Sequence, residues 1–178
     1  MTRRTDVWQR TAGGLVAIVE HVLALALIAG IALNFVNVVG RYLIGTTLTG
    51  VDEIEIYILI WIAFLGAAVV TWHGNHLRMD VLLEASPPSI RAAIRLLEVW
   101  VFAVITGFVA GTSFLYVGKI YALGAVSDIA RVPTWFPHSA VVVGFGAMTL
   151  IVVGRLVVRA LRLRLADDAE LPKGEPWP

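Results

Sequence analysis

Residues 56–72 read IYILIWIAFLGAAVVTW, a run of 17 residues without a charged side chain. A hydrocarbon core about 30 Å thick needs roughly 17–25 mostly apolar residues, because a helix rises about 1.5 Å per residue. Three further uncharged runs reach this length, at residues 22–40, 99–118 and 132–154. The sequence therefore predicts an all-α integral membrane protein with four transmembrane helices.

The composition of the chain also favours a membrane protein over a soluble one. Hydrophobic residues make up 58% of the 178 residues and charged residues 15%, with a mean hydropathy of +0.83. A soluble domain is roughly 45–50% apolar and about 25% charged. The chain has no cysteine, which excludes disulfides, thiolate metal sites and iron–sulfur clusters. Because it also lacks a phosphate loop and a nucleophile–base motif, we expect neither an enzyme nor a bound cofactor.

The distribution of lysine and arginine predicts the orientation in the membrane. Cytoplasmic loops of membrane proteins carry an excess of these two residues. Eleven of the 14 lie in the N-terminal segment, in the segment between the second and third runs, and in the C-terminal tail. The other two loops carry Arg41, Lys119 and Arg131. We therefore expect both termini and the central segment to be cytoplasmic.

The whole of residues 1–165 is expected to form one four-helix membrane domain, with spans near residues 15–40, 53–73, 96–119 and 132–156. The first span follows basic residues, as a signal peptide does, but its apolar run is longer and has no small-x-small cleavage site. An interfacial helical segment is expected on the cytoplasmic side near residues 76–95, with a helix start at Ser86-Pro87-Pro88-Ser89. The tail at 166–178 contains three prolines and is expected to be a disordered cytoplasmic segment.

Polar and small residues form a stripe along the first span. At 100° per residue, Gly30, Asn34, Asn37 and Arg41 share an arc of about 100° with Glu20. Such a stripe is expected to face protein, because asparagine can bond across helices and glycine allows close approach. Three interpretations remain open at this point: helix packing within the subunit, a surface for a partner protein, and an ion site.

The second and third spans carry related patterns. On the second, one helix face carries an acid near the outer end, Glu53, followed by aromatic and small residues at Tyr57, Trp61, Phe64 and Ala68. Trp61 is too deep for an interfacial aromatic belt, which favours packing against protein. On the third, a small-xxx-small ridge is formed by Ala103, Gly107 and Gly111.

Histidines near the membrane interface raise the question of a metal or haem site. His73, His76 and Asp80 have helical ligand spacing, but Gly74 interrupts it, and the histidines do not face one another at depth. We therefore expect no metal and no haem. Two glutamates near the cytoplasmic ends of their spans, Glu20 and Glu98, are expected to pair with His76 or Arg78.

An ordered series of motifs resembles a known family. An acidic pair at 52–53 leads to Tyr57, Trp61 and the run FLGAA at 64–68, and a His-x-x-x-Asp element follows at 76–80. Glu20, the run VVGRY at 38–42, and Ser127 before Val132-Pro133-x-Trp135 fit the same pattern. Over nearly the whole chain this resembles the small, Q-type (DctQ-like) permease subunit of tripartite ATP-independent periplasmic (TRAP) transporters. Ile56 departs from it, because the family often has a basic residue there.

The resemblance implies a role in transport. It implies a partner, the large (M-type) permease subunit, which carries the substrate and sodium sites in a bacterial or archaeal inner membrane. It also implies a periplasmic substrate-binding protein that delivers an organic acid, such as a dicarboxylate or a sialic acid. The small subunit would then be a scaffold in contact with membrane lipids, without any nucleic-acid partner. The interface and structural candidates are Glu20, Asn34, Asn37, Arg41, Glu53, Tyr57, Trp61, Gly66, His76, Arg78, Asp80, Pro133 and Trp135.

Two other functions were weighed against this one. A self-sufficient proton-coupled exporter would have four spans and use Glu20, but that glutamate lies near the end of its span rather than at mid-depth. A membrane anchor of a redox enzyme would need deep histidines or a quinone site, which the sequence does not show.

Overall fold

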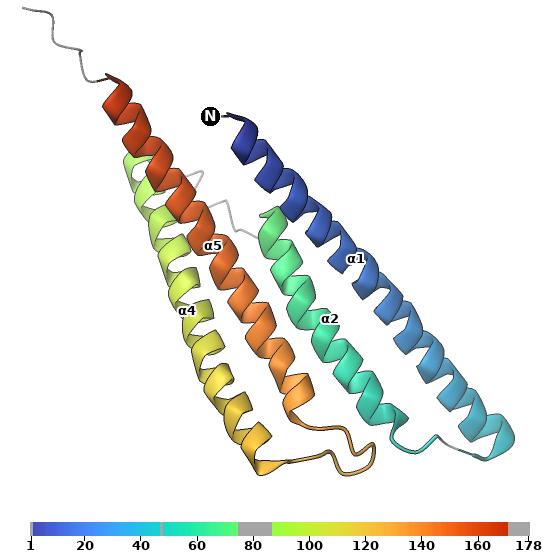
Figure 1. Ribbon diagram of the computed structural model, residues 1–178. Coiled ribbons are helices and arrows are strands. Elements are labelled where there is room, and N and C mark those ends of the chain that lie inside the picture. The colour runs from blue at the N-terminus through green and yellow to red at the C-terminus, as the bar shows by residue number, and fades with distance from the viewer. Residues whose placement is uncertain (1, 47, 75–86, 171–178) are drawn as a thin grey trace, which may run out of the picture.

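A computed structural model describes residues 2–46, 48–74 and 87–170, and within these ranges the protein is helical (Figure 1). The elements are α1 (Thr2–Val39), the π-helical turn η1 (Gly40–Ile44), α2 (Val51–His73), α4 (Pro88–Leu123) and α5 (Trp135–Glu170). The described part contains no strand, only an isolated bridge between Val126 and Pro133.

Four helices are long and apolar enough to cross a membrane. Their candidate spans are Gly13–Ile44, Val51–His73, Leu96–Leu123 and Trp135–Val158. This confirms the predicted fold class.

The helix ends follow local sequence signals. α4 begins at Pro88 in its first turn, where the Ser-Pro-Pro-Ser run predicts a helix start. α2 ends at His73 and is capped by Gly74, which has a φ of 72° and donates its N–H to the carbonyl of Thr71 at 3.2 Å. A left-handed residue of this kind closes a helix, and glycine adopts the conformation without a steric penalty.

Two helices are much longer than a bilayer requires. α4 has 36 residues, which is about 54 Å at the rise of an α-helix, so its part at 88–95 continues directly into the third span. α5 runs on to Glu170 and thus includes the start of the predicted tail. Residues 75–86 and 171–178 lie outside the described ranges, so the rest of the interfacial segment and of the tail stay predictions.

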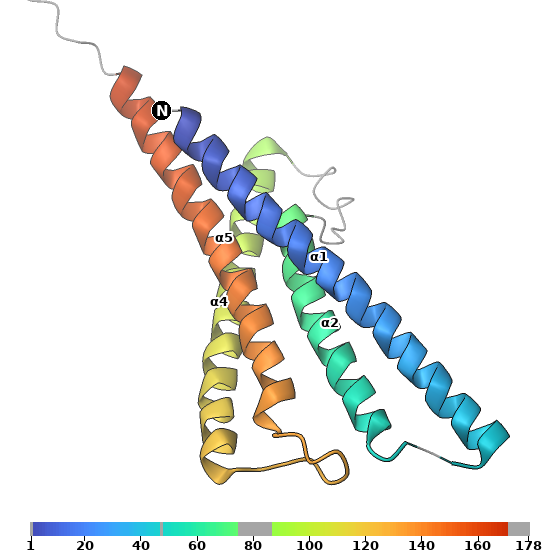
Figure 2. The ribbon, with the colours of Figure 1, turned by 45° about the vertical axis from the view of Figure 1, so that its right-hand side comes forward.

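The helices form an open row rather than a closed bundle. They contact one another in the order α4, α5, α2, α1, and among the described residues α1 touches only α2 and η1 (Figures 1 and 2). Because the row is one helix thick, few side chains are enclosed, and the buried ones among the described residues are mainly small or polar. We call the end with the connections at 45–50 and 124–134 the loop end, and the opposite end the terminal end.

A close approach at a glycine and a hydrogen bond between two threonines hold the middle of the row together. A Cβ atom added at Gly144 of α5 would lie 2.7 Å from both the Cβ and the carbonyl oxygen of Phe64 on α2. Between α4 and α5, the hydroxyl of Thr149 donates a hydrogen bond of 2.9 Å to that of Thr106. In lipid, such van der Waals contacts and interhelical hydrogen bonds replace the hydrophobic effect as the source of helix association.

Candidate functional site

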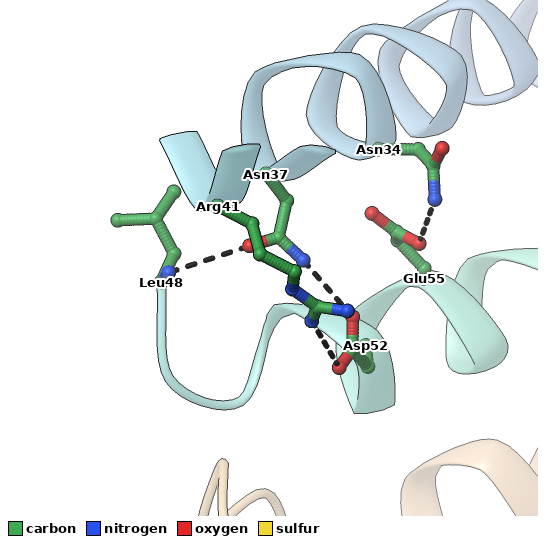
Figure 3. Close-up of polar contacts among 6 residues, drawn as sticks. All are labelled: Asn34, Asn37, Arg41, Leu48, Asp52 and Glu55. Atoms are coloured by element: carbon green, nitrogen blue, oxygen red, sulfur yellow. Dashed lines mark hydrogen bonds and ion pairs between the residues drawn. The ribbon is translucent and has the colours of Figure 1, made fainter. Parts of the chain in front are cut away.

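The predicted polar stripe of α1 meets acidic residues of α2 at the loop end (Figure 3). Asn34 donates its side-chain N–H to Oε2 of Glu55 at 2.8 Å. One turn further along, Asn37 donates to Oδ1 of Asp52 at 3.0 Å. Arg41 lies at 3.7 Å from the other oxygen of Asp52, in an exposed ion pair.

Asn37 is the central residue of this cluster. It is 4% exposed, and besides its bond to Asp52 it accepts the backbone N–H of Leu48 through Oδ1 at 3.3 Å. One side chain thus joins α1, the connecting loop and the start of α2. The stripe therefore packs within the subunit at Asn37, whereas Asn34 remains exposed beside it.

Glu53 fixes the second loop at the same end. Its carboxylate accepts the backbone N–H groups of Ile129 at 3.3 Å and Ala130 at 2.8 Å. The loop also has internal bonds between Ser127 and Val132, where the backbone N–H of Ser127 reaches the carbonyl oxygen at 2.9 Å and the Ser127 hydroxyl accepts the returning N–H at 3.1 Å. Glu53 is thus bonded to the loop that contains the Ser127–Val132 motif, although Glu53 and Ala130 are 77 residues apart in the sequence.

Aromatic rings connect this loop to the membrane-spanning part. Trp61 of α2 lies 5.4 Å from Phe136, measured between ring centroids, and Phe136 lies 6.2 Å from Trp135. Among the described residues, the indole N–H of Trp61 is buried and has no acceptor. At the start of α5, the carbonyl oxygen of Pro133 accepts the backbone N–H of Phe136 at 3.0 Å. Trp61 thus packs against another helix of the subunit, in agreement with the expectation from its deep position in the second span.

The remaining candidates of the second span have less defined surroundings. Tyr57 is half-buried, and an added Cβ at Gly66 would meet nothing within 4 Å. On the predicted ridge of α4, Gly107 contacts Thr149, whereas Gly111 is open and exposed.

Glu20, the glutamate candidate of the first span, lies toward the terminal end. Oε1 of Glu20 lies 3.6 Å from Nε2 of His73, a contact that the sequence did not predict. His76, Arg78 and Asp80 lie outside the described residues, and their predicted roles stay predictions. Within the described ranges, no three metal-type ligands come together.

Arg155 joins α5 to the end of α2 at this terminal end. It donates a hydrogen bond to the carbonyl of Trp72, and its guanidinium carbon lies 5.9 Å from the centre of the Trp72 ring. A cation at a helix C-terminus also interacts favourably with the helix dipole. In the sequence, Arg155 indicates only the orientation of the chain, because nothing local links it to Trp72.

A groove opens between α1 and α2 and runs from the polar cluster toward the terminal end. Its volume is about 240 Å³, and Asn34 and Glu55 line it together with apolar residues. Glu55 was missed as a site residue, although a signal was present in the sequence. Positions three apart lie on one helix face, so Glu55 lies on the same face as Asp52, whereas Glu53 lies on another.

Comparison with known proteins gives a consistent result. Residues 30–162 match the family model described as the DctQ component of tripartite ATP-independent periplasmic transporters. The chain is 27% identical over 124 residues to the ectoine TRAP transporter small permease protein TeaB of Halomonas elongata, a match that covers 70% of this chain and 64% of that protein. It is 28% identical over 160 residues to the C4-dicarboxylate TRAP transporter small permease protein DctQ of Rhodobacter capsulatus, covering 72% of this chain and 70% of that protein.

These matches confirm the resemblance that the motifs indicate, and the family match includes the polar cluster, the Glu53 loop and the aromatic contacts. The match spans just under two thirds of the length of the Halomonas relative. The chain belongs to the DctQ family, the small permease subunits of tripartite ATP-independent periplasmic transporters.

Proposed function

We propose that this chain is a scaffold that holds the large permease subunit of a TRAP transporter in the cytoplasmic membrane of a bacterium or archaeon. The observation that carries this proposal is the open row of helices. In the described part of the chain, α1 has a helix neighbour on one side only, and the row exposes large apolar side chains along its spans. Such surfaces fit lipid and another membrane protein.

Transport itself is assigned to the partner. The proposed activity of the assembly is sodium-driven uptake of an organic acid, dicarboxylate or sialic-acid-like, delivered by a periplasmic binding protein. Two relatives that are both named as small permease proteins carry different substrates in their names, ectoine and C4-dicarboxylates. A subunit that supports the frame without contacting the substrate is consistent with that difference.

The proposed orientation has both termini in the cytoplasm and the loop end in the periplasm. It rests on the excess of lysine and arginine in the terminal and central segments. The loop held by Glu53 would then face the binding protein, with Ile129 presented at 57% exposure. A loop fixed by charge-assisted hydrogen bonds can offer a constant surface to a soluble partner.

Co-purification from the native host tests the proposal. The chain is tagged at its C-terminus, extracted in mild detergent, and its partners are identified by mass spectrometry. We expect a much larger membrane protein with many helices in near-equal amount. Purification of the chain alone or as a homodimer, together with transport after reconstitution alone, would refute the scaffold role.

The orientation has an independent test, because the chain has no cysteine. A single cysteine at Asp128, in the loop at the loop end, should react with a membrane-impermeant maleimide in intact spheroplasts. A single cysteine at Thr11, near the N-terminus, should react only after the membrane is opened. The reverse pattern would overturn the orientation.

A further inference from the structure

The groove between α1 and α2 combines an apolar channel with one polar end. Its volume is about 240 Å³, and it is open to the outside along the row. The apolar lining comes from both helices: Leu27, Gly30, Ile31, Ile58, Leu59 and Ile62. Gly30 leaves space between the two helices, since an added Cβ there would come into contact with Ile58 at 3.7 Å. An open groove with apolar walls from two helices is the kind of surface on which another helix docks.

The polar end of the groove offers hydrogen-bond acceptors. Oε2 of Glu55 accepts the amide N–H of Asn34, and Oε1 is covered by the protein but has no donor among the described residues. Asn34 uses one N–H of its amide in this bond, so its carbonyl oxygen and its second N–H are not part of it. Asp52, three residues earlier, differs in having both an amide and a guanidinium as partners.

An unpaired carboxylate oxygen inside a span is costly unless a donor reaches it. Glu55 lines the groove, and the terminal torsion of glutamate is broad, so a small rotation can present the free oxygen to an occupant. A lipid acyl chain in the groove would supply no hydrogen-bond donor. The chemistry of the groove therefore favours an occupant that is apolar along its length and carries a hydrogen-bond donor at one position. A cationic donor fits best, because hydrogen bonds between ionised partners are the stronger ones.

We infer that this groove receives a transmembrane helix of the large permease subunit, whose lysine or arginine side chain pairs with Glu55. This inference rests on the proposed function and names the contact by which the scaffold holds its partner. The apolar ridge of that helix lies along Ile31 and Leu59, and its cation reaches the loop end of the groove. Glu55 is then a specificity-determining residue for assembly, since a helix without the cation would leave the carboxylate unpaired.

Site-specific photo-crosslinking tests where the partner helix lies. A benzophenone amino acid replaces Leu59 in the groove or Leu115 on α4, and the tagged complex is irradiated in native membranes. The two leucines are matched, because both are exposed, at 55% and 66%, and each lies eight residues from the loop end of its helix. We expect Leu59 to crosslink to the large subunit in clear excess over Leu115.

Three results of this experiment would overturn the inference. They are crosslinking of Leu59 to a second copy of this chain, crosslinking to lipid alone, and a yield from Leu59 no higher than that from Leu115. The unmodified tagged chain provides the check on the underlying proposal. If it retains the large subunit while Leu59 fails to crosslink, the scaffold role stands and only the docking site is wrong.

Charge removal tests the pairing. Glu55→Gln should weaken retention of the large subunit during washing by at least about tenfold, because it leaves a buried cation without its partner. The isolated subunit should be as stable as the wild type or more stable, since an unpaired charge is removed. Asp52→Asn is the matched control, because Asp52 bonds within the subunit and should lower its stability while retention changes little. Unchanged retention in Glu55→Gln would overturn the pairing.

Discussion

Replacing Gly144 with alanine tests the contact that joins the two halves of the row. Gly144 of α5 is buried against α2, where an added Cβ would lie 2.7 Å from the Cβ and from the carbonyl oxygen of Phe64, and 3.0 Å from its carbonyl carbon. Carbon atoms in contact prefer separations of about 3.5–4.0 Å. Because the atoms in the way belong largely to the backbone, α2 and α5 would have to move about 1 Å apart locally.

The expected cost follows from two opposing terms. Overpacking a well-packed contact costs about 1–3 kcal/mol, and the rigid backbone at Phe64 places this case near 2–3 kcal/mol. Alanine gains about 1 kcal/mol over glycine in a helix interior. The net loss in unfolding free energy for Gly144→Ala should therefore be about 1–2 kcal/mol.

Gly146→Ala is the matched control for this experiment. It lies two residues along the same helix, and an added Cβ would meet nothing within 4 Å. The helix-propensity term is common to both variants, so their difference isolates the clash and should be about 2–3 kcal/mol. Equilibrium unfolding of the purified subunit in mixed micelles measures it. Equal stability of the two variants would show that α2 and α5 do not approach closely at this point.

Three further changes have defined outcomes. Asn37→Leu leaves a carboxylate and a backbone N–H without their bonds and should cost about 1–3 kcal/mol in the same unfolding assay, with a smaller effect contradicting the buried bridge. Glu53→Gln should accelerate hydrogen exchange of the loop amides it binds without changing exchange at the terminal end, and unchanged protection of the loop would argue against the clamp. Thr106→Val and Thr149→Val should show a coupling of about 0.6 kcal/mol in a double-mutant cycle, whereas strictly additive losses would mean that the two hydroxyls do not bond.

Helical periodicity predicted part of the loop-end cluster. It placed Asn34 and Asn37 on one face of the first span, and the structure brings both to acids of α2. It left open whether the stripe faces the subunit or a partner, because a repeat of 3.6 residues defines a face but not its neighbour. The burial of Asn37 and the exposure of Asn34 separate these two cases only in three dimensions.

Contacts between segments far apart in the chain could not be predicted from the sequence. Glu53 was singled out as an acid at a helix start, but its bonds to the loop at 129–130 depend on α5 packing beside α2. Arg155 and Trp72 meet for the same reason at the other end of these helices. Glu20 was predicted to pair with His76 or Arg78, which lie outside the described residues, and within the described part the structure places His73 beside it.

The sequence by itself determined that the chain has four spans, because crossing a membrane depends on local length and hydropathy, which each segment carries independently. It also determined the family, through motifs whose order and spacing are linear properties. Only the tertiary structure decided that the helices stand in an open row in the order α4, α5, α2, α1, and that Glu55 faces a groove with an oxygen unpaired among the described residues. In lipid, every span is apolar toward every other, so hydropathy cannot rank their contacts. Close fits such as Gly144 on Phe64 select the neighbours, and these fits exist only once the helices have packed.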